Sequence, residues 1–350
     1  MTPFMKKIYF LFLIAFSLHS FGQTLEGSVF DENKNPVMGV SIYLDGTTIE
    51  TSTDENGKYI LNLKEKINTS LVIRYLGYET VYIGNPFENN NLKINLVPKA
   101  EQLNEVVIKK ELFNRKQKLM VFRAQFLGTS KAGKSCTISN EDSIDFEYDY
   151  DKNILYASAN EPLKVKNSYL GYEIEFDLHE FYVHFYKKSI KSTDVIKSFF
   201  LGTTFYREIT KGEKINKKRD NIYNGSQMDF FKNLSENKWR KDNFLFFVGS
   251  MQGNPELYFN LYNENNLTKI VLKDNQVSEV LLLNKPKFYA EYNLLYNKRE
   301  QSKIVFLSDT FYIDEFGNNS NPGDIEFSGA IGKNRLGDML PMNYSKQIKN

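Results

Sequence analysis

The sequence is poor in residues that make cross-links or bind transition metals. Its 350 residues include one cysteine and three histidines. A single cysteine, Cys136, excludes an internal disulfide, so stability in an oxidising compartment has to come from packing, and we expect the thiol to be buried. Only His179 and His184 lie beyond the first 22 residues, so histidine ligands for a catalytic zinc are scarce.

The chain also lacks an excess of charge, and it lacks a long apolar run after its first segment. Lys and Arg number 45 against 43 Asp and Glu, and without Lys6 and Lys7 the two counts are equal. A nucleic-acid-binding protein is expected to be clearly basic, so we predict no nucleic-acid partner. No later stretch reaches the roughly 20 apolar residues that a membrane-spanning helix needs.

Residues 1–22 have the order of a secretory signal peptide. Lys6 and Lys7 precede a mostly apolar run, residues 8–18, and small or polar residues close the segment. The run is about half as long as a bilayer-spanning helix, which favours a cleaved signal over an anchor. We expect cleavage before Gln23 and therefore an exported protein, located in the periplasm or associated with the outer membrane.

Residues 23–98 alternate apolar and polar side chains as short strands do. The apolar sets are Val40, Ile42 and Leu44; Tyr59, Leu61 and Leu63; Leu71, Ile73 and Tyr75; and Leu92, Ile94 and Leu96. Such alternation places one face of each strand in a core and the other in water, so Tyr43 is expected to face water. Gly57 lies where a hairpin needs positive φ. About seven strands in this length predict a small β-sandwich.

The same segment carries an ordered set of short motifs. They are Gly27-x-Val29-x-Asp31, Pro36-Val37-x-Gly39-Val40-x-Ile42, Gly46-Thr47, Thr53-Asp54-x-x-Gly57-x-Tyr59 and Tyr75-Leu76-Gly77-Tyr78. In these motifs the segment resembles the carboxypeptidase-regulatory-like domain. The resemblance implies a prealbumin-like Greek-key β-sandwich over residues 23–98.

In carboxypeptidases such a module accompanies a zinc peptidase domain, which needs a His-x-x-Glu pair and a distant second histidine. Here His179 and His184 lie five residues apart in DLHEFYVHF, a segment that alternates like a strand. We therefore expect their rings on opposite faces of the strand. No catalytic, cofactor-binding or metal-binding residue is assigned, and no cofactor is expected.

Residues 99–112 include EQLNEVVIKK, which is similar to the tail that joins such modules to the plugs of outer-membrane transporters. The residues that follow lack the repeated amphipathic strands of a transporter barrel. We interpret 99–112 as a linker or a last strand.

Residues 113–350 are expected to form a larger, mainly antiparallel β domain of unassigned function, α+β in character, with one or two helices. One helix is predicted after Ser226, an N-cap residue with Asp229 three residues later. Its apolar stripe should pack on a sheet and consists of Met228, Phe231 and Leu234, extended by Phe230. The basic run KGEKINKKRD before it is interpreted as a solvated helix face or a loop.

Two predicted strands of this region each have an acidic face. Apolar or aromatic residues alternate with Asp145, Glu147, Asp149 and Asp151 in one strand, and with Glu173, Glu175 and Asp177 in the other. Facing rows of carboxylates would repel unless a cation such as calcium lay between them. Solvated outer faces explain the pattern equally, so calcium binding stays open.

Residues 128–135, GTSKAGKS, match the G-x-x-x-x-G-K-S pattern of a phosphate-binding loop. A working loop of this kind follows a buried strand and opens a helix. The residues after Ser135 have a strand pattern instead, so we predict no nucleotide binding. We interpret 128–135 as a hairpin or connecting loop, in which Gly128 and Gly133 permit a turn between MVFRAQFL and CTI.

The C-terminal region is also similar to envelope proteins in which this module is joined to a domain of unassigned function. The similar pieces are FRAQFLG, CTISN, YLGYEIEFDLHEF, RDNIYNGSQMDFFKNL, FYIDEFGN and GDMLPMNY. This likeness implies architecture and location but no reaction. We therefore expect a non-catalytic protein of a Gram-negative envelope that binds a protein or glycan partner, with peripheral association with the outer membrane left open. The alternative is a secreted hydrolase that uses a carboxylate pair from the acidic strands, such as Asp149 or Asp177.

Overall fold

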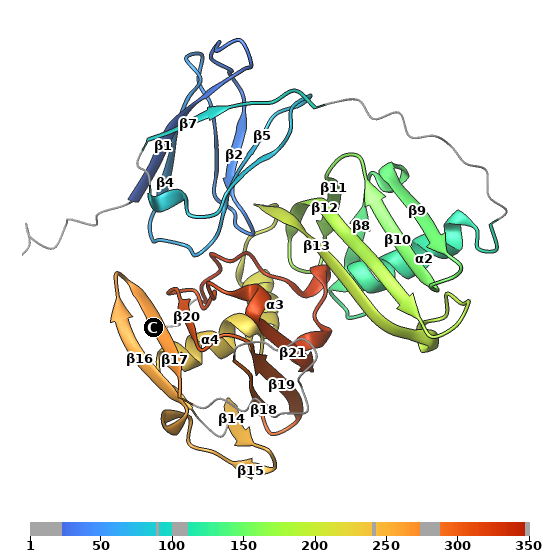
Figure 1. Cartoon of the computed structure of the whole chain (residues 1–350), viewed down its shortest axis with the longest axis vertical. Helices are drawn as coiled ribbons and strands as arrows, with labels where there is room; N and C mark the ends of the chain where they lie inside the picture. Colours follow the sequence, from blue (N-terminus) through green and yellow to red (C-terminus); the bar gives the residue numbers. More distant parts are fainter. Residues whose placement is uncertain (1–22, 89–90, 100–110, 240–242, 274–287, 347–350) are drawn as a thin grey trace, which may run out of the picture.

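The computed structural model of the chain describes residues 23–88, 91–99, 111–239, 243–273 and 288–346. It is mainly β, as the sequence predicts, and its strands form three bodies (Figure 1). We call them the N-terminal module (23–99), the middle body (111–210) and the C-terminal body (213–346). The predicted signal peptide and most of the predicted 99–112 linker lie outside the described residues.

The N-terminal module is the predicted sandwich. Its strands are β1 Gln23–Phe30, β2 Ser41–Leu44, β3 Glu50–Ser52, β4 Lys58–Leu63, β5 Leu71–Arg74, β6 Val81–Ile83 and β7 Asn91–Asn95. One sheet has the order β4-β1-β7 and the other β3-β2-β5-β6. The alternating apolar residues meet between the sheets, where Ile42, Leu44 and Ile73 are fully buried. Gly57 has φ +69°, as its place in the turn requires.

The middle body is an antiparallel sheet with a helix on one face. Its strands are β8 Cys136–Ile138, β9 Ile144–Asp149, β10 Ile154–Ala159, β11 Leu163–Asn167, β12 Tyr172–Phe185 and β13 Val195–Glu208. The long strands β12 and β13 pair along their length, and the other edge of β12 is shared by β11 and β10. Helix α2, Arg115–Phe126, packs Phe122 and Phe126 against the aromatic side chains of this sheet.

Helix α2 differs from the sequence expectation, which placed MVFRAQFL beside a turn within a mainly β pattern. The apolar run Leu119–Phe122 resembles a strand locally, but the segment begins with a capping box between Asn114 and Gln117. That pair of residues was the available signal for a helix. With α3 and α4, the described residues contain three α-helices rather than one or two.

The C-terminal body contains two sheets and two helices. Its strands are β14 Phe244–Val248, β15 Met251–Gln252, β16 Phe259–Glu264, β17 Leu267–Leu272, β18 Ala290–Tyr296, β19 Glu300–Phe306, β20 Thr310–Ile313 and β21 Ile325–Gly329. The sheet orders are β15-β14-β18-β19-β21 and β16-β17-β20. Helix α3 spans Glu213–Tyr223 and helix α4 spans Gln227–Ser235. The region predicted as one domain from residue 113 onward thus contains two large hydrophobic clusters, one per body.

Helix α4 confirms the predicted helix. The side chain of Ser226 accepts a hydrogen bond from the Asp229 amide at 3.3 Å. Phe230, Phe231 and Leu234 are buried in the core of the C-terminal body. Met228 packs instead against the core of the middle body, so helix α4 contacts the cores of two bodies with different faces.

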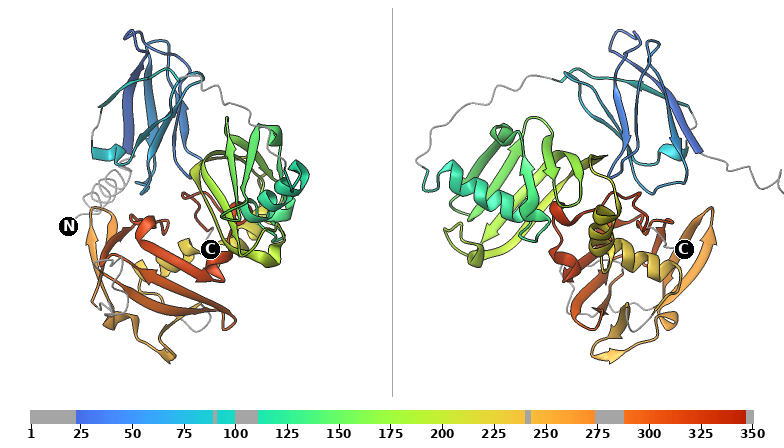
Figure 2. Two further views of the ribbon diagram at one scale, coloured as in Figure 1. Left: turned by 45° about the vertical axis from the view of Figure 1, so that its right-hand side comes forward. Right: turned by 180° about the vertical axis from the view of Figure 1, so that it is seen from behind.

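Helix α3 and the last described residues, 336–346, lie between the bodies (Figure 2). Leu336 and Leu340 belong to the core of the middle body, although they follow the last strand of the C-terminal body. The chain end therefore ties these two bodies together. None of the described helices is long and apolar enough to span a membrane.

Candidate functional site

The N-terminal module docks on the free edge of β13 through the turn after β2. The amide of Gly46 donates to the carbonyl oxygen of Thr204 at 2.7 Å, and the amide of Tyr206 donates to the carbonyl oxygen of Thr47 at 2.9 Å. The Asp45 carboxylate accepts from the Thr204 amide at 2.6 Å. The Gly46-Thr47 motif therefore covers an edge that would otherwise expose unpaired backbone groups.

A small apolar cluster of Tyr43, Val72 and Phe205 lies beside this edge. Tyr43 is only 2 % exposed, although the alternation of β2 predicts that it faces water. The prediction was wrong because the outer face of the β2–β5 sheet is covered by the middle body. Alternation with a period of two shows which residues share a face of a strand, but it does not show whether another part of the protein packs on the polar face.

The acidic face of β12 lies against the module. The Glu175 carboxylate pairs with Arg74 of the module, and its other oxygen lies 3.8 Å from Arg207. The hydroxyl of Tyr82 on β6 lies 2.8 Å from His179 Nε2 and 3.3 Å from the Asp177 carboxylate. The negative charge of Glu175 is thus compensated by Arg74 and Arg207.

The two carboxylates proposed for a hydrolase are not brought together. Asp149 of β9 pairs with Ile154 of β10, and Ile154 pairs in turn with His184 of β12. Asp177 lies seven residues before His184 on β12. At about 3.3 Å per residue the two positions are roughly 20 Å apart along the strands. Paired carboxylates in glycoside hydrolases lie about 5 to 10 Å apart. Asp149 instead accepts from the amides of Asp151 and Lys152 in its own turn.

His179 and His184 share one face of β12, contrary to the expectation of opposite faces. The register shifts between Leu178 and Glu180, so β12 has an irregularity at His179. The extra residue changes the alternation, and both histidines then lie on the less buried side. Among the residues that the structure describes, no three His, Cys, Asp or Glu side chains are grouped so that they could hold a metal ion.

The segment GTSKAGKS connects helix α2 to strand β8. It contains one 3₁₀ turn, Gly133–Ser135, and a strand follows it, as predicted. The amides that a phosphate-binding loop would offer are used inside the loop: Gly133 donates to the Ser130 hydroxyl, Lys134 to the Ser130 carbonyl and Ser135 to the Ala132 carbonyl. Ser130 in turn donates to Asp338 at 2.6 Å. The loop is a structural connection, and the absence of nucleotide binding stays a prediction.

A row of aromatic side chains crosses the outer face of the middle sheet, beyond the part that the module covers. Tyr182 of β12 pairs with Tyr156 of β10 on one side and with Phe199 of β13 on the other. Tyr182 and Phe199 stack with centroids 5.5 Å apart, and Tyr156 is 37 % exposed. We call this row the aromatic strip.

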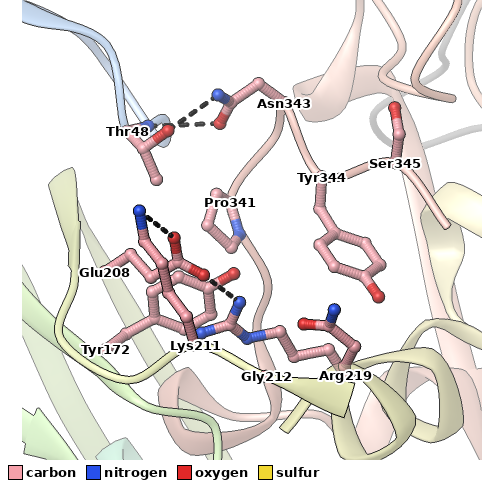
Figure 3. A pocket seen from close by; sticks show the side chains of 11 residues that line it. Thr48, Tyr172, Glu208, Lys211, Gly212, Arg219, Pro341, Asn343, Tyr344 and Ser345 are labelled. Carbon is pink, nitrogen blue, oxygen red and sulfur yellow. Dashed lines mark hydrogen bonds and ion pairs between the residues drawn. The ribbon is translucent and has the colours of Figure 1, made fainter. Parts of the chain in front are cut away.

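A pocket of about 310 Å³ lies where the three bodies meet (Figure 3). Thr48 of the module, the start of β12, the end of β13, helix α3 and the C-terminal segment all contribute to it. Its lining residues are Thr48, Tyr172, Glu208, Lys211, Gly212, Asn216, Arg219, Pro341, Asn343, Tyr344 and Ser345.

Arg219 anchors the floor of the pocket. Its side chain is 4 % exposed and donates to the carbonyl oxygens of Leu170 at 2.9 Å and Thr210 at 3.0 Å. It also pairs with one carboxylate oxygen of Glu208, while Lys211 lies 3.6 Å from the other. The guanidinium stacks over the Tyr172 ring at 4.1 Å. The Arg219 guanidinium is therefore held in a fixed position, whereas the Lys211 side chain is 80 % exposed.

The walls of the pocket are held by the C-terminal segment. The Asn343 side chain exchanges hydrogen bonds with Thr48, accepting from its amide at 3.1 Å and donating to its hydroxyl at 2.8 Å. The Tyr344 hydroxyl donates to Asp220 at 2.6 Å. The amide of Met342 donates to the Gly46 carbonyl at 2.7 Å.

The sequence did not single out this pocket. Its residues come from positions 48, 172, 208–219 and 341–345, and each position looks ordinary in its own segment. Four of the short pieces noted in the sequence nevertheless border it or contribute to it: Gly46-Thr47 borders it, YLGYEIEFDLHEF contains Tyr172, RDNIYNGSQMDFFKNL begins at Arg219, and GDMLPMNY contains Pro341, Asn343 and Tyr344. In the sequence these pieces indicated only a likeness to other proteins, and the structure shows that they lie side by side around the pocket.

Comparison with known proteins identifies the N-terminal module. Residues 25–108 match the CarboxypepD_reg-like domain family, so this chain contains that domain. The match agrees with the motifs and with the sandwich described above. No curated protein matches the chain.

Proposed function

We propose that this protein is a non-catalytic, exported protein of the Gram-negative envelope that binds a protein or glycan partner in the periplasm or at the outer membrane. The observation that carries the proposal is the pocket at the junction, whose walls come from the CarboxypepD_reg-like domain, the middle body and the C-terminal body. Ligand pockets occur preferentially at such boundaries between bodies. In this proposal the domain serves as one wall of a binding site.

The arrangement of charges in the pocket supports binding over catalysis. General acid–base catalysis needs a carboxylate or another titratable group that can reach the substrate's proton. Glu208 is the one carboxylate that lines the described pocket, and its two oxygens are paired with Arg219 and Lys211. The site therefore offers hydrogen-bonding groups rather than an unpaired carboxylate that could exchange protons with a substrate.

The proposal of export rests on residues 1–22. Their charge, apolar run and small residues follow the order of a signal peptide, and the likeness to envelope proteins indicates the same destination. Export is tested by fractionating cells and determining the N-terminus of the mature protein by mass spectrometry. We expect Gln23 as the first residue and recovery in the envelope fraction; intact Met1 in the cytoplasmic fraction would contradict this.

Partner binding is tested by crosslinking in intact envelopes, followed by purification and mass spectrometry. Asn216→Trp places a large side chain in the pocket, whereas Lys214→Trp alters an exposed position of the same helix that does not line it. We expect one stoichiometric partner with the unmodified protein and with Lys214→Trp, and its loss with Asn216→Trp. Recovery of no partner by the unmodified protein would remove the basis of the proposal.

A further inference from the structure

The N-terminus of helix α3 opens into the junction pocket. The helix spans 11 residues, and its N-cap is Gly212, at φ +124°, which has no side chain to cap the first turn. Backbone amides at the start of a helix lack partners within the helix and, with the helix dipole, favour negative charge nearby. Gly212 and the adjacent Lys211 both line the pocket. This end of the pocket is therefore suited to an anionic group.

Tyr172 gives independent evidence of a ligand. Its side chain lines the pocket, yet the residue is only 3 % exposed. The hydroxyl has no hydrogen-bond partner among the described residues and points toward the cavity (Figure 3). The ring is fixed between the Arg219 guanidinium, at 4.1 Å, and the ring of Tyr206, at 5.7 Å. Burial raises the pKa of Tyr172 to about 12, so the hydroxyl keeps its proton and can donate it.

The charges that line the pocket also favour an anion. Lys211 and Arg219 contribute two positive charges against the single negative charge of Glu208. Asp220 lies behind the wall, where it accepts from the Tyr344 hydroxyl, and does not line the pocket. The lining is therefore net positive by one charge.

The rest of the lining is polar, which decides between classes of anionic ligand. Asn216 and Ser345 supply an amide and a hydroxyl group, and Thr48 and Asn343 supply a hydroxyl and an amide that are bonded to each other. Besides Tyr172, the apolar surface of the described lining is limited to Pro341 and the ring of Tyr344. A peptide C-terminus would need a place for its apolar side chains or an open strand edge for its backbone. Amides and hydroxyls match the hydroxyl groups of a sugar instead.

We propose that the junction pocket binds a saccharide unit that carries a carboxylate. The carboxylate lies at the start of helix α3, near Lys211 and the Tyr172 hydroxyl. The sugar hydroxyls contact the amide of Asn216 and the hydroxyl of Ser345. This inference rests on the proposed function and specifies its partner as an acidic glycan.

The test is calorimetric titration of the purified protein with glucuronic acid, with glucose as the matched neutral sugar. We expect glucuronic acid to bind at least about ten times more tightly than glucose, and binding to weaken as salt is added. Tyr172→Phe removes one hydrogen-bond donor without changing the ring and should weaken binding about five-fold. Tyr169→Phe, three residues before Tyr172 and outside the pocket lining, should leave binding unchanged.

Three outcomes would overturn the assignment. The first is equal binding of glucose and glucuronic acid, because it would remove the role of the carboxylate. The second is binding of inorganic phosphate without binding of glucuronic acid, because the pocket would then be a simple oxyanion site. The third is full binding by Tyr172→Phe with unchanged thermal unfolding.

The two proposals fail separately. If the titration fails but crosslinking in envelopes still recovers a partner, a glycan at the pocket is excluded and the protein remains a binding protein, with the aromatic strip as the next surface to mutate. If the titration succeeds but no envelope partner is recovered and the protein is not exported, the proposed function fails and the pocket assignment stands.

Discussion

The rings of Tyr43 on β2 and Phe205 on β13 lie 5.3 Å apart between centroids, and both are almost completely buried. With Val72 they form a separate apolar cluster between the N-terminal module and the middle body. The two bodies are therefore joined by a packed core as well as by backbone hydrogen bonds. The position of the module, and with it the wall at Thr48, depends on this contact.

Replacing Tyr43 by alanine should destabilise the protein by about 3 kcal/mol, since a large buried aromatic side chain is removed and a cavity remains. The control is Ile60→Ala on the neighbouring sheet of the module, where the side chain is 57 % exposed and the cost should stay within about 0.5 kcal/mol. Denaturant unfolding measures both variants. Equal costs would contradict a shared core between the two bodies.

Arg74 and Glu175 should show energetic coupling across the same junction. Their side chains are 24 % and 28 % exposed, so solvent screens the pair in part. We expect a coupling free energy of about 1 kcal/mol in a double-mutant cycle with Arg74→Ala and Glu175→Ala, measured by unfolding. The double variant should therefore cost about 1 kcal/mol less than the sum of the two single variants, because the Arg74–Glu175 interaction is lost in either single variant and can be lost only once; after Arg74→Ala, Glu175 keeps Arg207 at 3.8 Å. Additive costs would show that the two side chains do not interact in solution.

Gly46→Ala should loosen the junction more than Gly39→Ala does. Both glycines have positive φ, +72° and +77°, so alanine costs about 1 to 2 kcal/mol at either position. A side chain at Gly46 would also lie 2.7 Å from the sulfur of Met342, whereas nothing lies within 4 Å at Gly39. We expect an additional cost of about 1 kcal/mol for Gly46→Ala in thermal or denaturant unfolding. A greater loss for Gly39→Ala would argue against the Gly46–Met342 contact.

Cys136 should be unreactive in the folded protein. The residue is 9 % exposed, and burial raises the pKa of its thiol from 9.0 to about 12. The folded state therefore keeps the thiol protonated at neutral pH, and at pH 8 the thiolate is on the order of a thousand times less populated than for an ordinary thiol. Labelling with Ellman's reagent at pH 8 should be very slow until denaturant is added, because the folded state has to open before the thiol can ionise and react. Complete labelling of the native protein within minutes at pH 8 would refute the buried thiol.

Short sequence patterns predicted the structure correctly where the apolar face of a strand or helix packs in the core of the body to which that element belongs. The alternation at Ile42, Leu44 and Ile73 predicted the module, and Gly57 predicted its turn. The N-cap at Ser226 predicted helix α4. Each of these signals is short-range, because strand alternation, turn conformation and helix capping are decided by neighbouring residues.

Alternation of apolar and polar residues gave a wrong expectation at Tyr43, at His184 and in helix α2. Tyr43 is buried by Phe205, and the register shift at His179 reverses the expected face of His184. Helix α2 was missed because its run of apolar residues looks like a strand until Asn114 and Gln117 are recognised as its cap. In each case the deciding interaction is a contact or an irregularity that alternation alone does not encode.

The sequence by itself determined that the chain is mainly β, that it begins its described part with a carboxypeptidase-regulatory-like sandwich, and where one of its helices starts. Only the tertiary structure decided how the three bodies meet, and therefore that Thr48, Tyr172, Arg219 and Tyr344 line one pocket. The reason is physical: secondary structure follows from interactions within a few residues, whereas a pocket at a junction exists only after surfaces far apart in the chain have been brought together and their unpaired groups covered.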